Sequence, residues 1–240
     1  MTAEPGRARA EDPVKIRIAF EGDSMVDGVW EGMARYAARD ACLKQVFEFG
    51  RFAKNSTGLT RVDKFNWPEE SRRIAESYKP DLVVVMMGLN DRQSVVEPDK
   101  SMAAWGSAQW SIKYGEEVRH MLEAAASARA GVLWLGVPAL REAEANDDAG
   151  VKNKLYAAVI SAFGDKRVAF VAPWRLNPTG EEVFKSIGPD LKGNVVQIRL
   201  NDGEHFTTAG HDLLGSYMFP KVIDHLASNG VKLPEDCHSH

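Results

Sequence analysis

Short apolar runs alternate with longer amphipathic segments along most of this chain. Five runs have the length and composition of β-strands and lie at residues 16–20, 46–49, 82–87, 132–135 and 168–171. The amphipathic segments predict helices at residues 29–39, 68–77, 108–128, 151–163 and 207–226. Strands that alternate with helices are typical of β-α-β units around a parallel sheet. The pattern therefore predicts an α/β fold.

The remaining segments are less regular. Glycine and proline interrupt residues 173–193, which predicts a long insertion, and the apolar stretch at 195–200 predicts one more short strand. The acidic stretch at 141–148 is expected to be a solvated loop, because its carboxylates lack the spacing of a calcium-binding loop. The expected division of the chain is a polar tail, one domain and a second tail, at residues 1–14, 15–228 and 229–240.

Charge and composition narrow the classes of function. The 30 basic and 34 acidic residues leave no basic surplus to neutralise a phosphate backbone, so we do not expect a nucleic-acid partner. The longest apolar run, residues 82–87, is far shorter than the roughly 20 residues of a membrane-spanning helix. The first 13 residues lack the apolar segment of a signal peptide. We therefore expect a cytoplasmic protein, or a periplasmic one if a leader has been removed.

Cysteine and histidine are sparse. Cys42 and Cys237 are too few for a disulfide framework or a four-cysteine zinc site, and we expect both to remain reduced. No pair of histidines has the spacing of a zinc protease, so the sequence predicts neither a metal nor a cofactor. The oligomeric state is left open.

Three polar segments fall where an open parallel sheet places its active site, just after the carboxyl ends of strands or before the last helix. Ser24 follows the first strand and is a candidate nucleophile, although a serine before a helix is often only a cap. Asn90 follows the third strand and could donate to an oxyanion, although asparagine is also common in turns. Near the last helix, Asp202 precedes His205 by three residues and could orient its ring.

A serine hydroxyl needs a base, a group that holds the base, and donors for the oxyanion, and these segments supply all of them. In these segments the sequence resembles the SGNH (GDSL-type) hydrolases. The matching blocks, in chain order, are Gly22-Asp23-Ser24, Lys54-Asn55-Ser56-Thr57-Gly58-Leu59, Gly88-Leu89-Asn90-Asp91 and Asp202-Gly203-Glu204-His205. Met25 replaces the family's leucine at a position expected to pack. The resemblance covers roughly residues 15–226.

The resemblance implies a three-layer α/β/α sandwich around a five-stranded parallel sheet in flavodoxin-like order, with a metal-free serine hydrolase site. Ser24 would be the nucleophile, His205 the base and Asp202 its partner. The oxyanion hole would consist of the Ser24 and Gly58 backbone amides and the Asn90 side chain. From the residues alone, Gly58 could equally be a flexible turn glycine. Asp23 and Asp91 are expected to brace the loops.

The choice of substrate depends on the geometry of loops, which the sequence does not determine. Arg92, Trp105, Trp110 and Trp174 are candidate substrate contacts; the alternatives are a surface ion pair for the arginine and core packing for the tryptophans. Residues 56–68 and 90–93 further resemble a bacterial subgroup found beside envelope polysaccharide genes. We therefore expect a serine esterase that removes small acyl groups, chiefly acetyl, from a carbohydrate or polysaccharide.

Other functions remain open at this stage. The same triad could serve a polysaccharide O-acyltransferase, which passes the acyl group to a sugar hydroxyl, or a lysophospholipase or thioesterase. A non-catalytic polysaccharide-binding protein would keep the fold without the chemistry. A nucleotide-binding module is disfavoured because the chain has neither a dinucleotide fingerprint nor a Walker loop.

Overall fold

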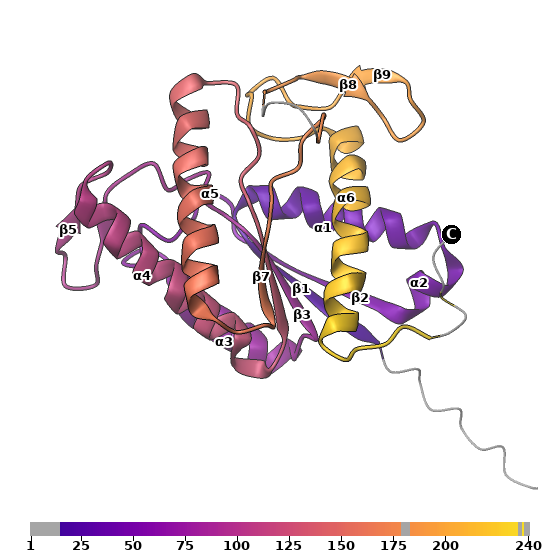
Figure 1. Ribbon diagram of the computed structural model, residues 1–240, viewed down its shortest axis with the longest axis horizontal. Helices are drawn as coiled ribbons and strands as arrows, with labels where there is room; N and C mark the ends of the chain where they lie inside the picture. Colours follow the sequence, from indigo (N-terminus) through magenta and orange to yellow (C-terminus); the bar gives the residue numbers. More distant parts are fainter. Residues whose placement is uncertain (1–14, 179–182, 235–236, 238–240) are drawn as a thin grey trace, which may run out of the picture.

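A parallel sheet of five strands forms the centre of the molecule (Figure 1). The computed structural model describes residues 15–178, 183–234 and 237. In spatial order the strands are β2 (Phe47–Ala53), β1 (Ile16–Gly22), β3 (Leu82–Met86), β6 (Gly131–Leu135) and β7 (Val168–Val171). Every neighbouring pair is parallel. The expected α/β fold class, with its flavodoxin-like strand order, is confirmed.

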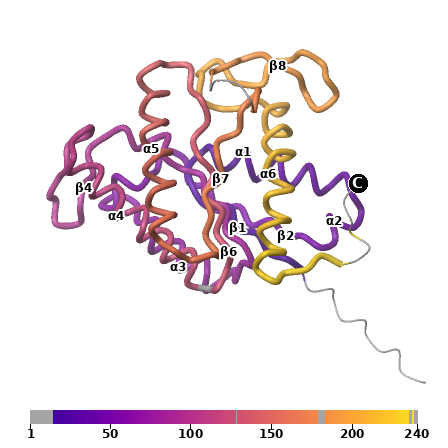
Figure 2. Tube along the Cα trace, viewed as in Figure 1, coloured from indigo at the N-terminus to yellow at the C-terminus, as the bar shows by residue number. Residues whose placement is uncertain are grey.

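Helices cover both faces of the sheet and complete three layers (Figures 1 and 2). One face carries α1 (Ser24–Ala38), α6 (Thr208–Ser228) and the short α2 (Ala41–Val46). The other face carries α3 (Trp67–Tyr78), α4 (Ala108–Ala125), which the 3₁₀ turn η1 (Ala126–Ala128) extends, and α5 (Ala143–Phe163). No helix in the described part of the chain is long and apolar enough to cross a membrane.

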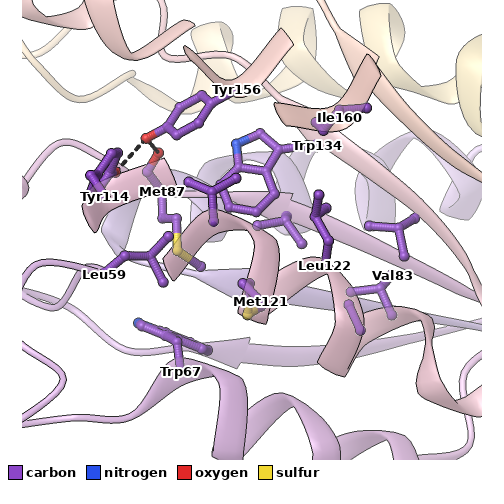
Figure 3. Packing of buried hydrophobic residues seen from close by; sticks show 14 of the residues in the cluster. Leu59, Trp67, Val83, Met87, Tyr114, Met121, Leu122, Trp134, Tyr156 and Ile160 are labelled. Carbon is purple, nitrogen blue, oxygen red and sulfur yellow. Dashed lines mark hydrogen bonds between the residues drawn. The ribbon is translucent and has the colours of Figure 1, made fainter. Parts of the chain in front are cut away.

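Each face of the sheet has its own apolar cluster, because side chains alternate along a strand. In the fully buried strand β3, Val84 packs toward α1 and α6, whereas Val83 packs toward α3, α4 and α5. Figure 3 shows the second cluster, in which the rings of Trp134 and Tyr156 lie 4.9 Å apart. Burial on both faces requires an unbroken apolar run, which is why β3 is recognisable in the sequence.

The helix starts differ from those expected. α1 begins at Ser24 rather than at residue 29, because the Asp23 carboxylate caps it. α5 begins at Ala143, so the expectation of a solvated loop at 141–148 is wrong for most of that stretch. The Glu142 side chain accepts hydrogen bonds from two N–H groups of the first turn, and acidic side chains are favourable there. The short α2 was not expected.

Two small antiparallel ribbons lie outside the central sheet. β4 (Val95–Val96) pairs with β5 (Met102–Ala103) between β3 and α4, and β8 (Ile187–Pro189) pairs with β9 (Val195–Gln197) in the insertion after β7. β9 lies within the stretch 195–200 that was expected to form a strand. In Figure 1 this hairpin lies above the first turn of α6. The tail expected at residues 1–14 lies outside the described residues.

Cys42 and Cys237 form a disulfide, so the expectation that both remain reduced is wrong. The bond joins α2 to the chain that follows α6, where Val231 and Leu233 pack against the apolar cluster of α1 and α6. The two cysteines are 195 residues apart in sequence, and only the fold brings their Cα atoms to 5.4 Å. Short-range spacing carries no sign of such a pair.

Glu21 is an acidic residue within the apolar strand β1. It is fully buried on the face covered by α3, and neither carboxylate oxygen has a hydrogen bond of ordinary geometry to a described residue. Burial raises the pKa of Glu21 to about 7; the nearby Ser71 hydroxyl acts in the opposite direction, and Glu70 adds to the rise. The folded protein therefore binds this proton more tightly than the unfolded chain does.

We expect Glu21→Gln to stabilise the protein more at pH 8.5 than at pH 5. The wild-type carboxyl loses its proton in the unfolded chain near pH 4.5 but in the folded protein only near 7, so stability falls as the pH rises through that interval. The full shift corresponds to at most roughly 3 kcal/mol. Urea unfolding of both proteins at the two pH values measures the effect. An unfolding free-energy difference that does not change with pH would contradict it.

Candidate active site

Ser24, His205 and Asp202 form a continuous chain of hydrogen-bonded side chains. Ser24 Oγ lies 2.7 Å from His205 Nε2, and His205 Nδ1 lies 2.9 Å from Asp202 Oδ2. Because the carboxylate accepts at Nδ1, the neutral ring carries its proton there, and Nε2 accepts from the serine hydroxyl. In this geometry an imidazole can take a proton from a hydroxyl. The fold thus brings together side chains that the sequence separates by 181 positions.

Ser24 lies at the carboxyl edge of the sheet, where β1 ends and α1 begins. β1 has β2 on one side and β3 on the other, so successive connections leave this point in opposite directions. Open α/β sheets bind their ligands at such a switch point. As the first residue of α1, Ser24 has a backbone N–H without a partner inside the helix, and the helix dipole adds positive potential there.

Asp23 joins this turn to the loop after β3. Its buried carboxylate accepts hydrogen bonds from the N–H groups of Met25 at 2.9 Å, Gly88 at 3.1 Å and Leu89 at 3.2 Å. Burial raises the pKa of Asp23 to about 7, against the effect of these N–H groups and with a contribution from Asp91. The carboxylate holds the two loops together, which is the bracing role expected of it.

The loop that carries Asp202 and His205 is held from two directions. Asp202 Oδ1 accepts from the N–H groups of Glu204 at 2.8 Å and of His205 at 3.0 Å. Arg199, which is 2% exposed, donates to the carbonyl of Glu204 at 2.7 Å and to that of Ala139, beyond β6, at 2.9 Å. Burial lowers the pKa of Arg199 to about 10. Arg199 therefore anchors the histidine loop to the neighbouring loop.

Asp202 is electrostatically suited to face an imidazole. Burial alone would raise the pKa of its carboxyl, but the hydrogen bonds from the Glu204 and His205 N–H groups, together with the His205 side chain, outweigh burial and lower it. The group therefore remains a carboxylate near neutral pH. A carboxylate at this position can stabilise the imidazolium that forms when His205 takes a proton.

Asn90 and Gly58 lie on adjacent loops near this edge. Asn90 Nδ2 donates to the carbonyl of Thr57 at 3.0 Å, which leaves its second amide hydrogen for another acceptor. Gly58 is buried, and a Cβ added there would lie 2.0 Å from Asp91 Oδ1. This close approach requires glycine, so the residue is more than a flexible turn position.

Asp91 links these loops to the helices beneath them. Its buried carboxylate accepts from the N–H and hydroxyl of Thr60 at 3.0 and 2.9 Å, and from the Tyr114 hydroxyl at 2.7 Å. The Tyr114 and Tyr156 hydroxyls lie 2.7 Å apart, and Tyr156 donates to the Met87 carbonyl at 3.2 Å (Figure 3). Polar side chains from α4 and α5 thus support the loop that carries Asn90.

Arg92 is occupied by carboxylates of α5 and its cap. It pairs with Asp148 at 2.6 Å, with Glu142 at 3.4 Å and with Glu144. This arrangement matches the surface ion pair that the sequence left as the alternative to a substrate contact. Its guanidinium charge is already balanced before any ligand binds.

The three tryptophans occupy different environments. Trp110 is 1% exposed, lies 4.5 Å from the Tyr114 ring, and donates to the Gln93 carbonyl, so it packs in the core. Trp105 is half-buried with its edge against Trp110. Trp174 is half-buried and lies edge-on to the Phe206 ring, beside His205. Of these three rings, only those of Trp105 and Trp174 present surface that a ligand could contact.

A cavity of about 240 Å³ adjoins the Asn90 and His205 loops, and its most buried charged residue, Lys152, was not predicted as a site residue. Lys152 on α5 lines the cavity, is 3% exposed, and donates to the Gly88 carbonyl at 2.7 Å. Burial lowers the pKa of Lys152, although nearby carboxylates, Asp91 foremost, oppose the shift. One signal was available: Lys152 shares a helical stripe with the buried residues Ala149, Tyr156 and Ile160.

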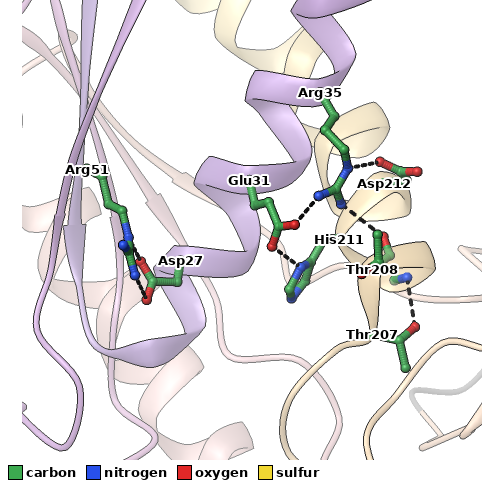
Figure 4. Close-up of polar contacts among 9 residues, drawn as sticks. Asp27, Glu31, Arg35, Arg51, Thr207, Thr208, His211 and Asp212 are labelled. Carbon is green, nitrogen blue, oxygen red and sulfur yellow. Dashed lines mark hydrogen bonds and ion pairs between the residues drawn. The ribbon is translucent and has the colours of Figure 1, made fainter.

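A polar network also joins α1 to α6 (Figure 4). His211 Nδ1 lies 2.8 Å from Glu31, and Arg35 pairs with both Glu31 and Asp212. Because α1 starts at Ser24 and α6 follows the loop that carries His205, the network fixes these two helices relative to each other. Within the described residues, no three His, Cys, Asp or Glu side chains gather where a metal ion could bind.

The family described as "Protein of unknown function (DUF459)" matches residues 17–221. No sequence among the curated proteins matches the chain. Several solved structures share its fold, which confirms the resemblance to the SGNH (GDSL-type) hydrolases at the level of architecture.

Three of these structures illustrate the likeness. A carbohydrate esterase family 3 protein from Talaromyces cellulolyticus is 13% identical, with a TM-score of 0.59 over 89% of this chain and 99% of its own. An acetyl xylan esterase is 18% identical, with a TM-score of 0.57 over 87% and 100%. A GDSL-like lipase from Bacteroides thetaiotaomicron is 16% identical, with a TM-score of 0.55 over 88% and 91%. At identities this low, the structural likeness establishes a common fold and nothing further.

Gly58→Ala is expected to destabilise the protein by about 1–3 kcal/mol, because the new methyl group would displace the Asp91 carboxylate from its partners. Gly150→Ala in α5 is the matched control: a Cβ there meets nothing within 4 Å, so the helix should gain roughly 0.5–1 kcal/mol. Urea unfolding measures both. Equal effects of the two substitutions would show that the close approach at Gly58 has no energetic importance.

Proposed function

The chain belongs to the DUF459 family and has the fold of GDSL-type hydrolases, and from this premise we propose that it is a serine esterase. It would remove small acyl groups, chiefly acetyl, from a carbohydrate. The observation that carries the proposal is the hydrogen-bonded chain from Ser24 through His205 to Asp202 at the carboxyl edge of the sheet. A hydroxyl, an imidazole and a carboxylate in this order can perform acyl transfer.

In the proposed reaction, Ser24 Oγ attacks the ester carbonyl carbon while His205 Nε2 takes the hydroxyl proton. The tetrahedral intermediate collapses, and His205 returns that proton to the departing alcohol, which leaves an acyl ester on the serine. Water then attacks this ester with His205 again acting as the base, and the carboxylic acid departs. Asp202 stabilises the imidazolium in both halves.

The negative charge on the tetrahedral oxygen needs donors that are already in place. The proposal assigns this task to the backbone N–H groups of Ser24 and Gly58 and to the second Asn90 amide hydrogen. Its support is the burial of Gly58 and the hydrogen bond that orients Asn90. Loss of one such donor typically lowers the rate ~10²- to 10³-fold.

Two observations favour a small acyl group on a sugar. Proteins of similar fold are described as a carbohydrate esterase and as an acetyl xylan esterase. The cavity beside the site, about 240 Å³, is smaller than the roughly 300–1,000 Å³ of pockets for drug-sized ligands and leaves room for a single sugar ring.

We also propose that the protein works in an oxidising compartment, such as the periplasm. Disulfides persist in such compartments and are rare in the reducing cytosol, and the bond between Cys42 and Cys237 supports this location. This proposal replaces the cytoplasmic expectation with its periplasmic alternative.

Ser24→Ala is expected to reduce ester hydrolysis on the order of 10⁴-fold or more, with folding unchanged. The measurement is a panel of esters from aryl acetate to acetylated oligosaccharides, with acyl chains of increasing length. His120→Ala, at a half-exposed histidine on α4, is the control and should retain wild-type rates. Full hydrolysis by folded Ser24→Ala would refute the proposal.

The same panel separates the alternatives. Acetyl transfer to an oligosaccharide acceptor in preference to water would identify an acyltransferase. A preference for long acyl chains or thioesters would identify a lysophospholipase or thioesterase. Tight oligosaccharide binding, with no hydrolysis and no labelling of Ser24 by a serine-directed phosphonate, would identify a binding protein.

Reduction of the disulfide is expected to lower the free energy of unfolding by about 2–5 kcal/mol, because the bond closes a long loop. Thiol alkylation of protein made in its native cells should find both cysteines blocked. The double variant Cys42→Ser/Cys237→Ser is the control, since its stability should not respond to reductant. Free thiols on fully folded protein from those cells would contradict the proposed compartment.

A further inference from the structure

The cavity beside the site contacts both loops that carry the proposed catalytic groups. Gly88 and Leu89, which lead into Asn90, form one wall, and Glu204, the neighbour of His205, forms another. The opposite side comes from the segment after β6 and from the first turns of α5, including Lys152. A group bound in this cavity would therefore lie beside the loops that carry Asn90 and His205.

Lys152 has hydrogen-bonding capacity that the protein does not use. An ammonium has three donors, and the hydrogen bonds within the described residues account for one, to the Gly88 carbonyl at 2.7 Å. No described carboxylate pairs with it within 4.0 Å, and the ring of Trp105 lies 5.4 Å away. Lys152 is only 3% exposed, and a buried charged group needs partners for all its donors. Because Lys152 lines the cavity, a ligand bound there can supply these partners.

The other groups around the cavity determine what kind of partner fits. Glu142, Asp148 and Glu204 line it together with Arg92 and Lys152, so carboxylates outnumber cations. The charge of Arg92 is already balanced by α5 carboxylates. An anionic ligand would meet net negative charge. A hydroxyl can accept from Lys152 and donate to Glu204, while Leu89 and Val137 supply apolar contact.

We propose that this cavity is a subsite for a neutral, hydroxyl-bearing sugar ring adjacent to the ester, with Lys152 donating to a ring oxygen or hydroxyl and Glu204 accepting from a hydroxyl. The inference rests on the proposed esterase function and narrows its substrate class. It selects neutral acetylated sugars over acetylated uronic acids. The cavity volume suits a single ring.

Three matched acetate esters test the subsite: an acetylated neutral oligosaccharide, an acetylated oligouronate and an aryl acetate without a sugar. Lys152→Met should lower the ratio of kcat/KM for the neutral oligosaccharide to that for the aryl acetate about tenfold or more, the size expected for a lost charged hydrogen bond. The ratio isolates sugar binding from any shift of the Gly88 loop. Lys154→Met, at an exposed lysine on the same helix, should leave the ratio unchanged.

Glu204→Gln provides a second variant that does not depend on the folding of Lys152→Met. The contacts of Glu204 with Arg199 and Asp202 use backbone atoms, so the substitution preserves them. Removal of its charge should raise the rate on the oligouronate relative to the neutral oligosaccharide. Calorimetric titration of the deacetylated neutral oligosaccharide into Ser24→Ala, with and without Lys152→Met, measures binding apart from turnover.

The outcomes separate this inference from the function on which it rests. Ser24-dependent hydrolysis with substrate ratios unaffected by Lys152→Met and Glu204→Gln would overturn the subsite and leave the esterase intact. Oligosaccharide binding that depends on Lys152, without Ser24-dependent hydrolysis, would overturn the esterase and keep the subsite. Faster turnover of the oligouronate by the wild-type protein would overturn the neutral-sugar preference.

Discussion

The buried carboxylate of Asp23 is the contact on which the geometry of the site depends. It accepts N–H groups from the start of α1 and from the loop after β3, segments 65 residues apart that become neighbours only when β1 and β3 pair. A carboxylate removed from water without such donors would be very unfavourable. The pairing of β1 with β3 and these hydrogen bonds therefore depend on each other, and together they fix the position of Ser24, the next residue.

A second set of polar contacts supports the same loops from below. Tyr114, Tyr156 and Lys152 lie beneath the loop after β3 and engage the Asp91 side chain and the carbonyls of the loop. Arg199 serves the histidine loop in the same way. Such groups are unfavourable in a core unless every partner is present. The edge of the sheet that holds the site thus concentrates polar interactions that the apolar remainder of the core must offset.

The sequence predicted what is encoded locally. Strands β3 and β6 were recognisable because burial on both faces requires consecutive apolar residues. Ser24, Asn90 and His205 were recognisable as candidates because each follows or precedes an element at the carboxyl edge of the sheet. Lys152 was missed because a lysine in an amphipathic helix is usually exposed, and its partner is the carbonyl of Gly88, 64 positions earlier. The cysteines were misjudged for the same reason, since their proximity is a property of the fold.

The disulfide changes the connectivity of the chain. Because it joins Cys42 to Cys237, a single cut of the backbone anywhere between them leaves one covalent molecule. A protease that opened the chain between β7 and β9 would separate the serine and the histidine in sequence, yet both fragments would remain linked. The residues between the cysteines form a covalent ring to which the segment carrying Ser24 is attached at Cys42, so the two halves of the site stay covalently joined after such a cut.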